Sequence, residues 1–130
     1  MNFHLVLVTK YRKKVFSQPI LERLESIIKD VCKKWDVTLD EFGGEEDHIH
    51  LLISMHPSLQ PSKFINNLKT VSSRRLRSEY SEYMKKFYWK PMLWTRAYCL
   101  LSTGGANIET IRNYIQNQGK EEDVTAPDLT

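Results

Sequence analysis

Apolar positions along the chain follow two spacings, and each predicts a different kind of element. Short aliphatic and β-branched runs bounded by glycine, proline or charged residues are typical of strands, whereas apolar residues that recur every three or four positions are typical of amphipathic helices. The helical spacing is clear where Leu21, Leu24, Ile28, Val31 and Trp35 share one face. The sequence therefore predicts strands at 3–10, 37–42, 48–55 and 97–102, and helices at 21–35, 62–78 and 108–118.

Turn and capping residues separate these elements. Ser17-Gln18-Pro19 is a typical start for the first helix, Pro61 opens the second, and Asn107 is placed to cap the last. Two glycines and three acidic residues at 43–47 predict a turn between two strands, and 103–106 predict a flexible joint.

The order of elements predicts an α+β fold. Strand, helix, two strands, helix and strand in succession match the ferredoxin-like, or split βαβ, arrangement: an antiparallel sheet with helices on one face, here followed by a C-terminal helix. The other face of the sheet is expected to stay open. Residues 1–120 are expected to form one domain, and 121–130 an acidic, disordered tail.

Length and composition exclude several classes of protein. A chain of 130 residues, 41% of them hydrophobic, is long enough for one buried core. No apolar run approaches the ~20 residues that span a bilayer, and the basic residues of 10–14 follow the first apolar run, unlike those of a signal peptide. A cytoplasmic protein without membrane association is therefore expected. Cys32 and Cys99 lack the spacing of a zinc site or disulfide framework, so we expect reduced core residues.

The net charge of +3 is unevenly distributed. Glu121, Glu122, Asp123 and Asp128 are the only charged residues of 121–130, so residues 1–120 carry 19 basic and 12 acidic side chains, a net charge of +7. A basic domain of this kind favours a polyanionic partner and speeds encounter with it, without indicating any sequence preference.

Two histidines separated by one residue are the strongest chemical signal. Side chains of a strand alternate between its faces, so His48 and His50 project from one face and Ile49, Leu51 and Ile53 from the other. Such a pair is able to bind one metal ion. A single histidine in a strand is more often structural, and the spacing alone favours neither interpretation.

A second candidate group lies in the last predicted helix. Tyr114 and Gln118 are four residues apart and share a helical face. Alone, each is an ordinary helix residue. Together with the histidine pair, they offer a nucleophilic hydroxyl and an amide oxygen.

These segments resemble the single-tyrosine HUH transposases, small enzymes that move insertion sequences as single-stranded DNA. The resemblance covers nearly all of residues 1–119, and its three motifs occur in the family's order at the family's length. The motifs are Phe3-His4-Leu5-Val6-Leu7-Val8-Thr9-Lys10-Tyr11-Arg12, Asp47-His48-Ile49-His50-Leu51-Leu52-Ile53 and Ile111-Arg112-Asn113-Tyr114-Ile115-Gln116-Asn117-Gln118.

The resemblance implies a role for four residues. His48 and His50 would be metal ligands, Tyr114 the nucleophile, and Gln118 a third ligand from the catalytic C-terminal helix. It also implies Mg or Mn as the working ion, DNA hairpins at the element ends as substrate, and a homodimer whose subunits share active sites. His4 recurs in the family's first strand and receives no catalytic role. A domesticated relative, which cuts hairpins without mobilising an element, would have nearly the same sequence.

Phosphodiester chemistry explains why these residue types belong together. The anionic oxygens repel an attacking group, so a divalent ion that neutralises them lowers the barrier. A tyrosine phenol, with a pKa of ~10, is a better leaving group than a sugar hydroxyl. Attack by Tyr114 would leave a 5′ phosphotyrosine that keeps the energy of the phosphodiester, so strands are rejoined without ATP. The absence of a phosphate-binding Gly-x-x-x-x-Gly-Lys loop agrees with this.

Other residues fit DNA binding less specifically. Gly104 and Gly105 are hinge candidates, with a simple turn as the alternative. Aromatic residues between 80 and 98 include candidate stacking partners for bases, although most are expected in the core or a dimer interface. Basic side chains that would contact phosphates, instead of only facing solvent, are Lys10, Arg12, Lys13, Lys14, Lys69, Arg74, Arg75 and Arg77.

Two alternatives of other classes remain. A non-catalytic binder of single-stranded nucleic acid or hairpins would need exposed aromatics on its central strands, where this sequence has mostly aliphatic residues and histidine. A metal-dependent or two-histidine phosphoesterase would hydrolyse by activated water; the two-histidine type needs two His-x-Ser/Thr motifs, whereas the chain has one His-x-His. Tyr114→Phe separates the phosphoesterase from the transposase, because an enzyme that uses water would keep its activity and one that uses a tyrosine nucleophile would lose it.

Overall fold

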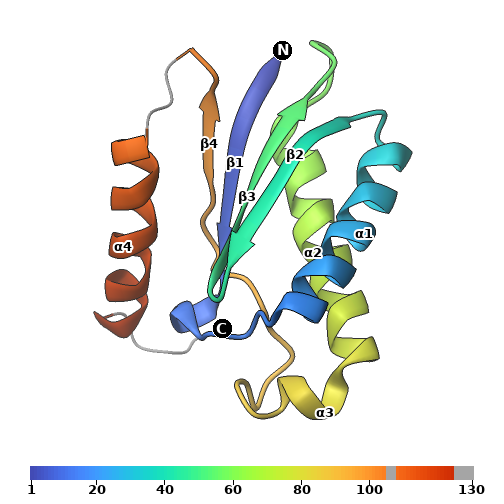
Figure 1. Ribbon diagram of the computed structural model, residues 1–130. Coiled ribbons are helices and arrows are strands. Elements are labelled where there is room, and N and C mark those ends of the chain that lie inside the picture. Colours follow the sequence, from blue (N-terminus) through green and yellow to red (C-terminus); the bar gives the residue numbers. More distant parts are fainter. Residues whose placement is uncertain (105–107, 125–130) are drawn as a thin grey trace.

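The computed structural model describes the backbone of residues 1–104 and 108–124, and the side chains of 1–104 and 109–117 (Figure 1). Its sheet has four antiparallel strands in the order β2-β3-β1-β4, so the first and third strands along the chain lie in the centre. This is the predicted split βαβ sheet. The strands are β1 (Asn2–Val8), β2 (Thr38–Glu45), β3 (His48–Ser54) and β4 (Cys99–Ser102).

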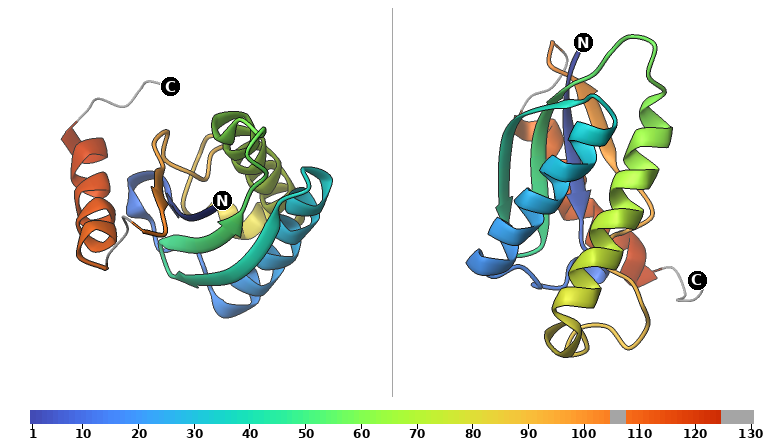
Figure 2. Two further views of the ribbon diagram at one scale, coloured as in Figure 1. Left: turned by 90° about the horizontal axis from the view of Figure 1, so that it is seen from above. Right: turned by 90° about the vertical axis from the view of Figure 1, so that its right-hand side faces the viewer.

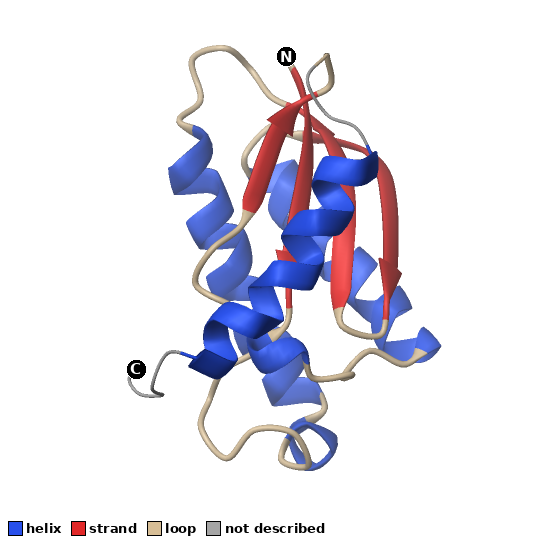
Figure 3. Cartoon of the chain, turned by 90° about the vertical axis from the view of Figure 1, so that its left-hand side faces the viewer, coloured by secondary structure: helices blue, strands red, loops and turns tan. Residues whose placement is uncertain are grey.

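Helices cover both faces of this sheet. The two long helices α1 (Gln18–Lys34) and α2 (Pro61–Glu79) lie on one face, and α4 (Ile108–Val124) lies across the other (Figures 2 and 3). Two short elements join them: the 3-10 turn η1 (Lys10–Arg12) after β1, and α3 (Ser81–Met84) after α2. The open face of the predicted sheet is therefore the face that meets the C-terminal helix.

Apolar side chains that alternate along β1 and β3 point to the face under α1 and α2, where they form the core. Leu5 and Leu7 of β1 and Ile49, Leu51 and Ile53 of β3 have no solvent exposure, and they pack with the buried side chains of α1 and α2. Burying one such side chain contributes about 1.5–3 kcal/mol, so this face holds the sheet and helices together. The residues between them face α4.

The predicted turn at 43–47 is wrong in its first half, because β2 continues through Gly43 and Gly44 to Glu45. A Cβ atom on Gly44 would lie 2.9 Å from Cδ2 of Leu21 and 3.1 Å from Cγ2 of Ile49. The glycine is thus a point of close packing between β2, α1 and β3, where an added side chain would displace Leu21. Its presence in the sequence signals contact and not a turn.

The C-terminal region differs from the expected boundaries. Helix α4 runs to Val124, so 121–124 are helical where the composition predicts a disordered tail; 125–130 lie outside the described residues. The expected cap Asn107 also lies outside them. Cys32 is buried and Cys99 half-buried, both as free thiols, which agrees with reduced core residues. No helix in the described part of the chain has the length and apolar character to cross a membrane.

Candidate active site

The histidine pair lies on the sheet face that meets α4. His48 and His50 are half-buried on β3, on the opposite side from the buried Ile49 and Leu51, as the alternation predicts. Both imidazoles line a cleft of about 570 Å³ between the end of β3, η1 and α4. The cleft is lined by Arg12, Lys14, Glu45, Glu46, Asp47, His48, His50, Ile111, Arg112, Ile115 and Gln116.

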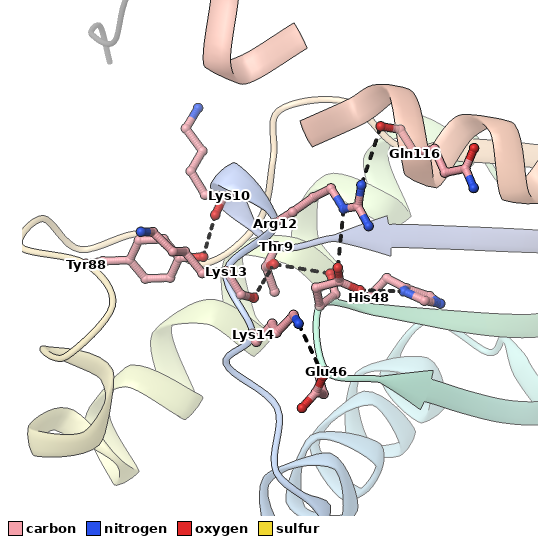
Figure 4. Close-up of polar contacts among 10 residues, drawn as sticks. Thr9, Lys10, Arg12, Lys13, Lys14, Glu46, His48, Tyr88 and Gln116 are labelled. Carbon is pink, nitrogen blue, oxygen red and sulfur yellow. Dashed lines mark hydrogen bonds and ion pairs between the residues drawn. The ribbon is translucent and has the colours of Figure 1, made fainter. Parts of the chain in front are cut away.

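A chain of polar contacts holds His48. Its Nδ1 donates to Oδ1 of Asp47 at 2.8 Å, and Oδ2 of Asp47 accepts from Nε of Arg12 at 3.3 Å. The second arm of the Arg12 guanidinium reaches the backbone oxygen of Gln116 on α4, at 3.5 Å (Figure 4). Asp47 thus orients the imidazole from behind, in the manner of carboxylates that support metal-binding histidines.

The turn η1 places Arg12 by an unusual backbone conformation. Tyr11 and Arg12 have φ angles of 59° and 53°, the left-handed region that non-glycine residues rarely adopt. Buried Thr9 fixes the turn from one side: its hydroxyl donates to the backbone oxygens of Lys13 and Asp47 at 2.7 and 3.1 Å. Strained residues persist where the surroundings hold them, and here the strain delivers a guanidinium to the carboxylate behind His48.

His50 is held by another histidine. Nδ1 of His4 on β1 and Nε2 of His50 are 2.7 Å apart, and the two rings are nearly parallel with centroids 4.9 Å apart. Burial, followed by the charge of the neighbouring His4, lowers the pKa of His50. His50 is therefore neutral at pH 7, the state in which an imidazole is a metal ligand. The sequence reasoning gave His4 no role, although an imidazole among the aliphatic residues of a central strand was the available signal.

The C-terminal helix faces the cleft with one side. Ile111, Arg112 and Ile115 line it, whereas Tyr114 is half-buried, with a hydroxyl oxygen shielded from solvent, and is not among the described lining residues. The side chain of Gln118 lies outside the described residues. Arg112 adds a cation to the cleft two residues before Tyr114, a position that sequence reasoning did not single out.

The predicted phosphate contacts divide into separate groups. Arg12 and Lys14 line the cleft, where Lys14 lies 4.0 Å from Glu46; Lys10 begins η1 and Lys13 directly follows it (Figure 4). Lys69 and Arg77 belong to a different cavity, described below. Arg74 is exposed on α2, and Arg75 pairs with Asp30 of α1 at 3.2 Å. The hinge candidate Gly104 is exposed, and Gly105 lies outside the described residues.

The donor set fits a divalent metal ion in part. The contacts of Asp47 and His4 leave Nε2 of His48 and Nδ1 of His50, and both rings face one cleft. In the described ranges, no three histidine, cysteine, aspartate or glutamate residues are grouped to hold a metal. Two imidazoles therefore need a ligand of another type or from another segment, such as the amide of Gln118.

The fold and the site together define a class: a small split βαβ domain with a supported imidazole pair under a C-terminal helix. The family described as "Transposase IS200 like" matches residues 1–118, and the chain belongs to this family.

Individual relatives agree with this assignment. The chain is 29% identical over 122 residues to the ISDra2 transposase TnpA of Deinococcus radiodurans, covering 94% of this chain and 86% of that protein. It is 31% identical over 121 residues to the transposase for insertion sequence element IS200 of Salmonella typhimurium, covering 93% and 78%.

Two solved structures have the same fold. A crystal structure of a transposase candidate from Deinococcus radiodurans R1 superposes with a TM-score of 0.84 at 30% identity, covering 91% of this chain and 90% of the other. A REP-associated tyrosine transposase bound to a REP hairpin superposes with a TM-score of 0.58 at 10% identity, covering 88% of this chain and 61% of the other. At that identity the second likeness concerns the fold alone.

Proposed function

We propose that this transposase cleaves and rejoins single-stranded DNA at insertion-sequence ends, with Tyr114 as the nucleophile. The observation that carries the proposal is the meeting of two elements across one cleft: the supported imidazole pair of β3, and the helix that bears Tyr114. A water-using nuclease needs no tyrosine-bearing helix there. Membership of the IS200-like family makes DNA strand transfer the chemistry to test first.

His48 and His50 would hold a Mg or Mn ion, with Gln118 as third ligand. When bound, such an ion neutralises the anionic phosphate oxygens and favours attack at phosphorus. Asp47 and His4 position the two imidazoles, because each occupies one ring nitrogen and so fixes which nitrogen is left for the metal. Arg12 and Arg112 add positive charge along the path of the DNA strand.

The proposed covalent step exchanges one ester for another. Oη of Tyr114 forms a bond to phosphorus while the bond from phosphorus to the 3′ oxygen breaks. The phenol gives up its proton and the departing oxygen takes one up, so the products are a 5′ phosphotyrosine and a free 3′ hydroxyl. Because the phosphodiester energy is retained, attack by a 3′ hydroxyl on this intermediate rejoins strands and releases Tyr114.

The position of Tyr114 bears on assembly. In a single chain its hydroxyl is shielded from solvent beside the cleft, while its neighbours Ile111 and Ile115 face the cleft. Attack therefore requires α4 to turn or to be supplied by a second subunit. We infer a homodimer in which α4 of one subunit completes the site of the other, as the family resemblance also implies.

DNA hairpins at the element ends are the proposed substrate. The basic charge of residues 1–120 favours a polyanion. A protein of the same fold is bound to a REP hairpin. Because hairpin recognition separates one element end from bulk DNA, it would direct Tyr114 to a defined phosphodiester.

The test is a denaturing-gel assay for a covalent adduct between the protein and labelled single-stranded oligonucleotides from DNA that flanks its own gene. Reactions contain Mg, Mn or EDTA, and the wild type is compared with Tyr114→Phe and with the control Tyr80→Phe, a tyrosine at the end of α2 away from the cleft. We expect a metal-dependent adduct with the wild type and Tyr80→Phe but not with Tyr114→Phe. Cleavage without an adduct that survives Tyr114→Phe would make the protein a hydrolytic nuclease. Hairpin binding with no adduct under any metal would indicate a non-catalytic binder.

A further inference from the structure

A second concave surface lies beyond η1 from the active site. Two adjoining cavities of about 240 and 310 Å³ share Arg77 and Met92, and together they form a groove between α2, α3 and the segment that leads to β4. We call it the basic groove; its charged lining residues are Lys69, Arg77, Lys85, Lys90 and Arg96, and its aromatic ones are Tyr88, Trp89 and Trp94.

The charge of the basic groove differs from that of the active-site cleft. None of its described lining residues is acidic, whereas the cleft contains Glu45, Glu46 and Asp47. Burial, followed by the charge of Arg74, lowers the pKa of Arg77, whose Nε donates to the hydroxyl of Ser73 at 3.0 Å. The groove therefore concentrates positive charge, of which Lys85 is partly neutralised by an exposed ion pair with Glu82 at 3.3 Å. Such a surface favours a polyanion.

An exposed tryptophan stands at one end of the groove. Trp89 is 87% exposed, and Met1 is the only other large hydrophobic residue exposed in the described part of the chain. Nζ of Lys90 lies over the indole ring, 4.7 Å from its centroid, which places a cation on one face of this exposed aromatic side chain. Aromatic faces next to cations are the usual means of binding single-stranded nucleic acid, because every base has a face to stack and a phosphate beside it.

Hydrogen bonds within the protein hold one wall of the groove in place. Nζ of Lys69 donates to the backbone oxygens of Thr95 and Arg96, both at 2.7 Å, and so holds their segment against α2. Nε1 of buried Trp94 donates to the hydroxyl of Ser72 at 3.0 Å, which fixes the same segment from within. This wall of the groove is therefore already ordered, so its own ordering adds little to the free-energy cost of binding a strand.

The basic groove and the active-site cleft both adjoin η1. Tyr88, which lines the groove, donates its hydroxyl to the backbone oxygen of Lys10 in η1 at 2.7 Å, and Figure 4 shows it beside Lys10 and Lys13. The other side of η1 carries Arg12 into the active-site cleft. A strand leaving the cleft past η1 would reach the basic groove.

We infer that the basic groove binds single-stranded DNA that continues from the active site, with Trp89 stacked on an unpaired base and the groove cations on flanking phosphates. The inference rests on the proposed function in one respect: the strand it binds is the one that Tyr114 would cleave. The groove thereby selects substrates that carry a single-stranded segment next to the cleaved position.

The first test measures affinity for an unstructured labelled (dT)20 oligonucleotide by fluorescence anisotropy, in EDTA and in a Tyr114→Phe background, so that no cleavage occurs. Trp89→Ala is expected to weaken binding about 5- to 100-fold, and Trp89→Phe, which keeps an aromatic face, to retain most of it. Binding should also quench tryptophan fluorescence, and Trp89→Phe should remove most of that quenching. Unchanged affinity of Trp89→Ala would overturn the inference.

The second test separates the groove from general positive charge. Lys85→Gln with Lys90→Gln removes two groove cations, and the matched control Lys33→Gln with Lys34→Gln removes two exposed lysines from the far end of α1. Only the groove variant should weaken binding and reduce the slope of log Kd against log salt, by about 1.4 for two phosphate contacts. Equal losses in both variants would assign the binding to net charge and overturn the inference.

The two proposals fail in distinguishable ways. If Tyr114 forms the adduct but Trp89→Ala leaves DNA affinity unchanged, the proposed function stands and the inference about the basic groove is wrong. Trp89-dependent binding without any adduct would keep the groove and reject the proposed function.

Discussion

The two faces of the sheet are formed by the same strands but differ in polarity and burial. On the face under α1 and α2, Leu51 and its neighbours are wholly buried and apolar. On the face under α4, His50 and His48 alternate with them in sequence, yet each imidazole has a polar partner, His4 or Asp47. The main core cluster thus lies on one face, and the candidate active site lies on the other. A residue's position along β3 predicts which property a substitution changes.

The largest effect is expected from removing an imidazole. His48→Ala or His50→Ala should abolish covalent cleavage, because the proposed metal loses one of its two imidazole ligands, and the loss should exceed the roughly 10- to 100-fold that follows removal of a supporting residue. Hairpin binding should stay largely intact, since the proposed phosphate contacts are made by basic residues other than these two histidines. Adduct gels and anisotropy with the same hairpin measure both properties. Loss of binding together with cleavage, in a well-folded variant, would contradict a purely catalytic role.

Adjacent leucines test the division between the faces by stability. Leu51→Ala removes a fully buried side chain from the core and should lower the free energy of unfolding by about 2–5 kcal/mol. Its matched control is Leu52→Ala, a half-buried residue on the face under α4, where a smaller loss is expected. Urea denaturation followed by circular dichroism compares them. Equal losses would mean that both faces contribute alike to the core.

The supporting residues should act on metal binding more than on stability. His4→Phe keeps an aromatic ring in place but removes the contact to Nε2 of His50, and Asp47→Asn weakens the support of His48. Each is expected to lower Mn affinity about 10- to 100-fold, as measured by isothermal titration calorimetry. His56→Phe, in an exposed loop, is the control that should change nothing. Wild-type Mn affinity in His4→Phe would reduce His4 to a packing residue.

The smallest effect is expected at an ion pair on the helix side. Arg23 of α1 contacts Glu79 of α2 through two hydrogen bonds of 2.6 and 2.8 Å, but both side chains are about one-third exposed. A double-mutant cycle with Arg23→Ala and Glu79→Ala should give about 0.2–1 kcal/mol.

The pH dependence of this pair has a definite sign. The hydrogen bond with Arg23 lowers the pKa of Glu79, so its contribution is complete above the unfolded-state pKa and is lost as the pH falls through the lower folded-state pKa. Urea titrations at neutral and acidic pH should show the coupling energy shrink in acid. A coupling that persisted at low pH would mean that packing and not charge joins the two helices.

Local patterns sufficed for much of the fold, for a physical reason. The spacing of apolar residues reports which side of an element is buried, so α1, α2 and the faces of β3 followed from 21–35, 62–78 and 48–55. Gly44 shows where this reasoning ends. A glycine signals a turn and a close contact equally well, and only the position of Leu21 decides between them.

The sequence by itself determined the fold class, the shared face of His48 and His50, and membership of a transposase family through three ordered motifs. The tertiary structure decided which residues support them, because partners such as His4 and His50 are 46 positions apart and meet only through strand pairing. It also gathered the basic groove from α2, α3 and the segment before β4, since no local pattern records which charged surfaces adjoin. The spacing of apolar residues can be read from neighbouring positions, whereas contacts between distant segments form only when the chain folds.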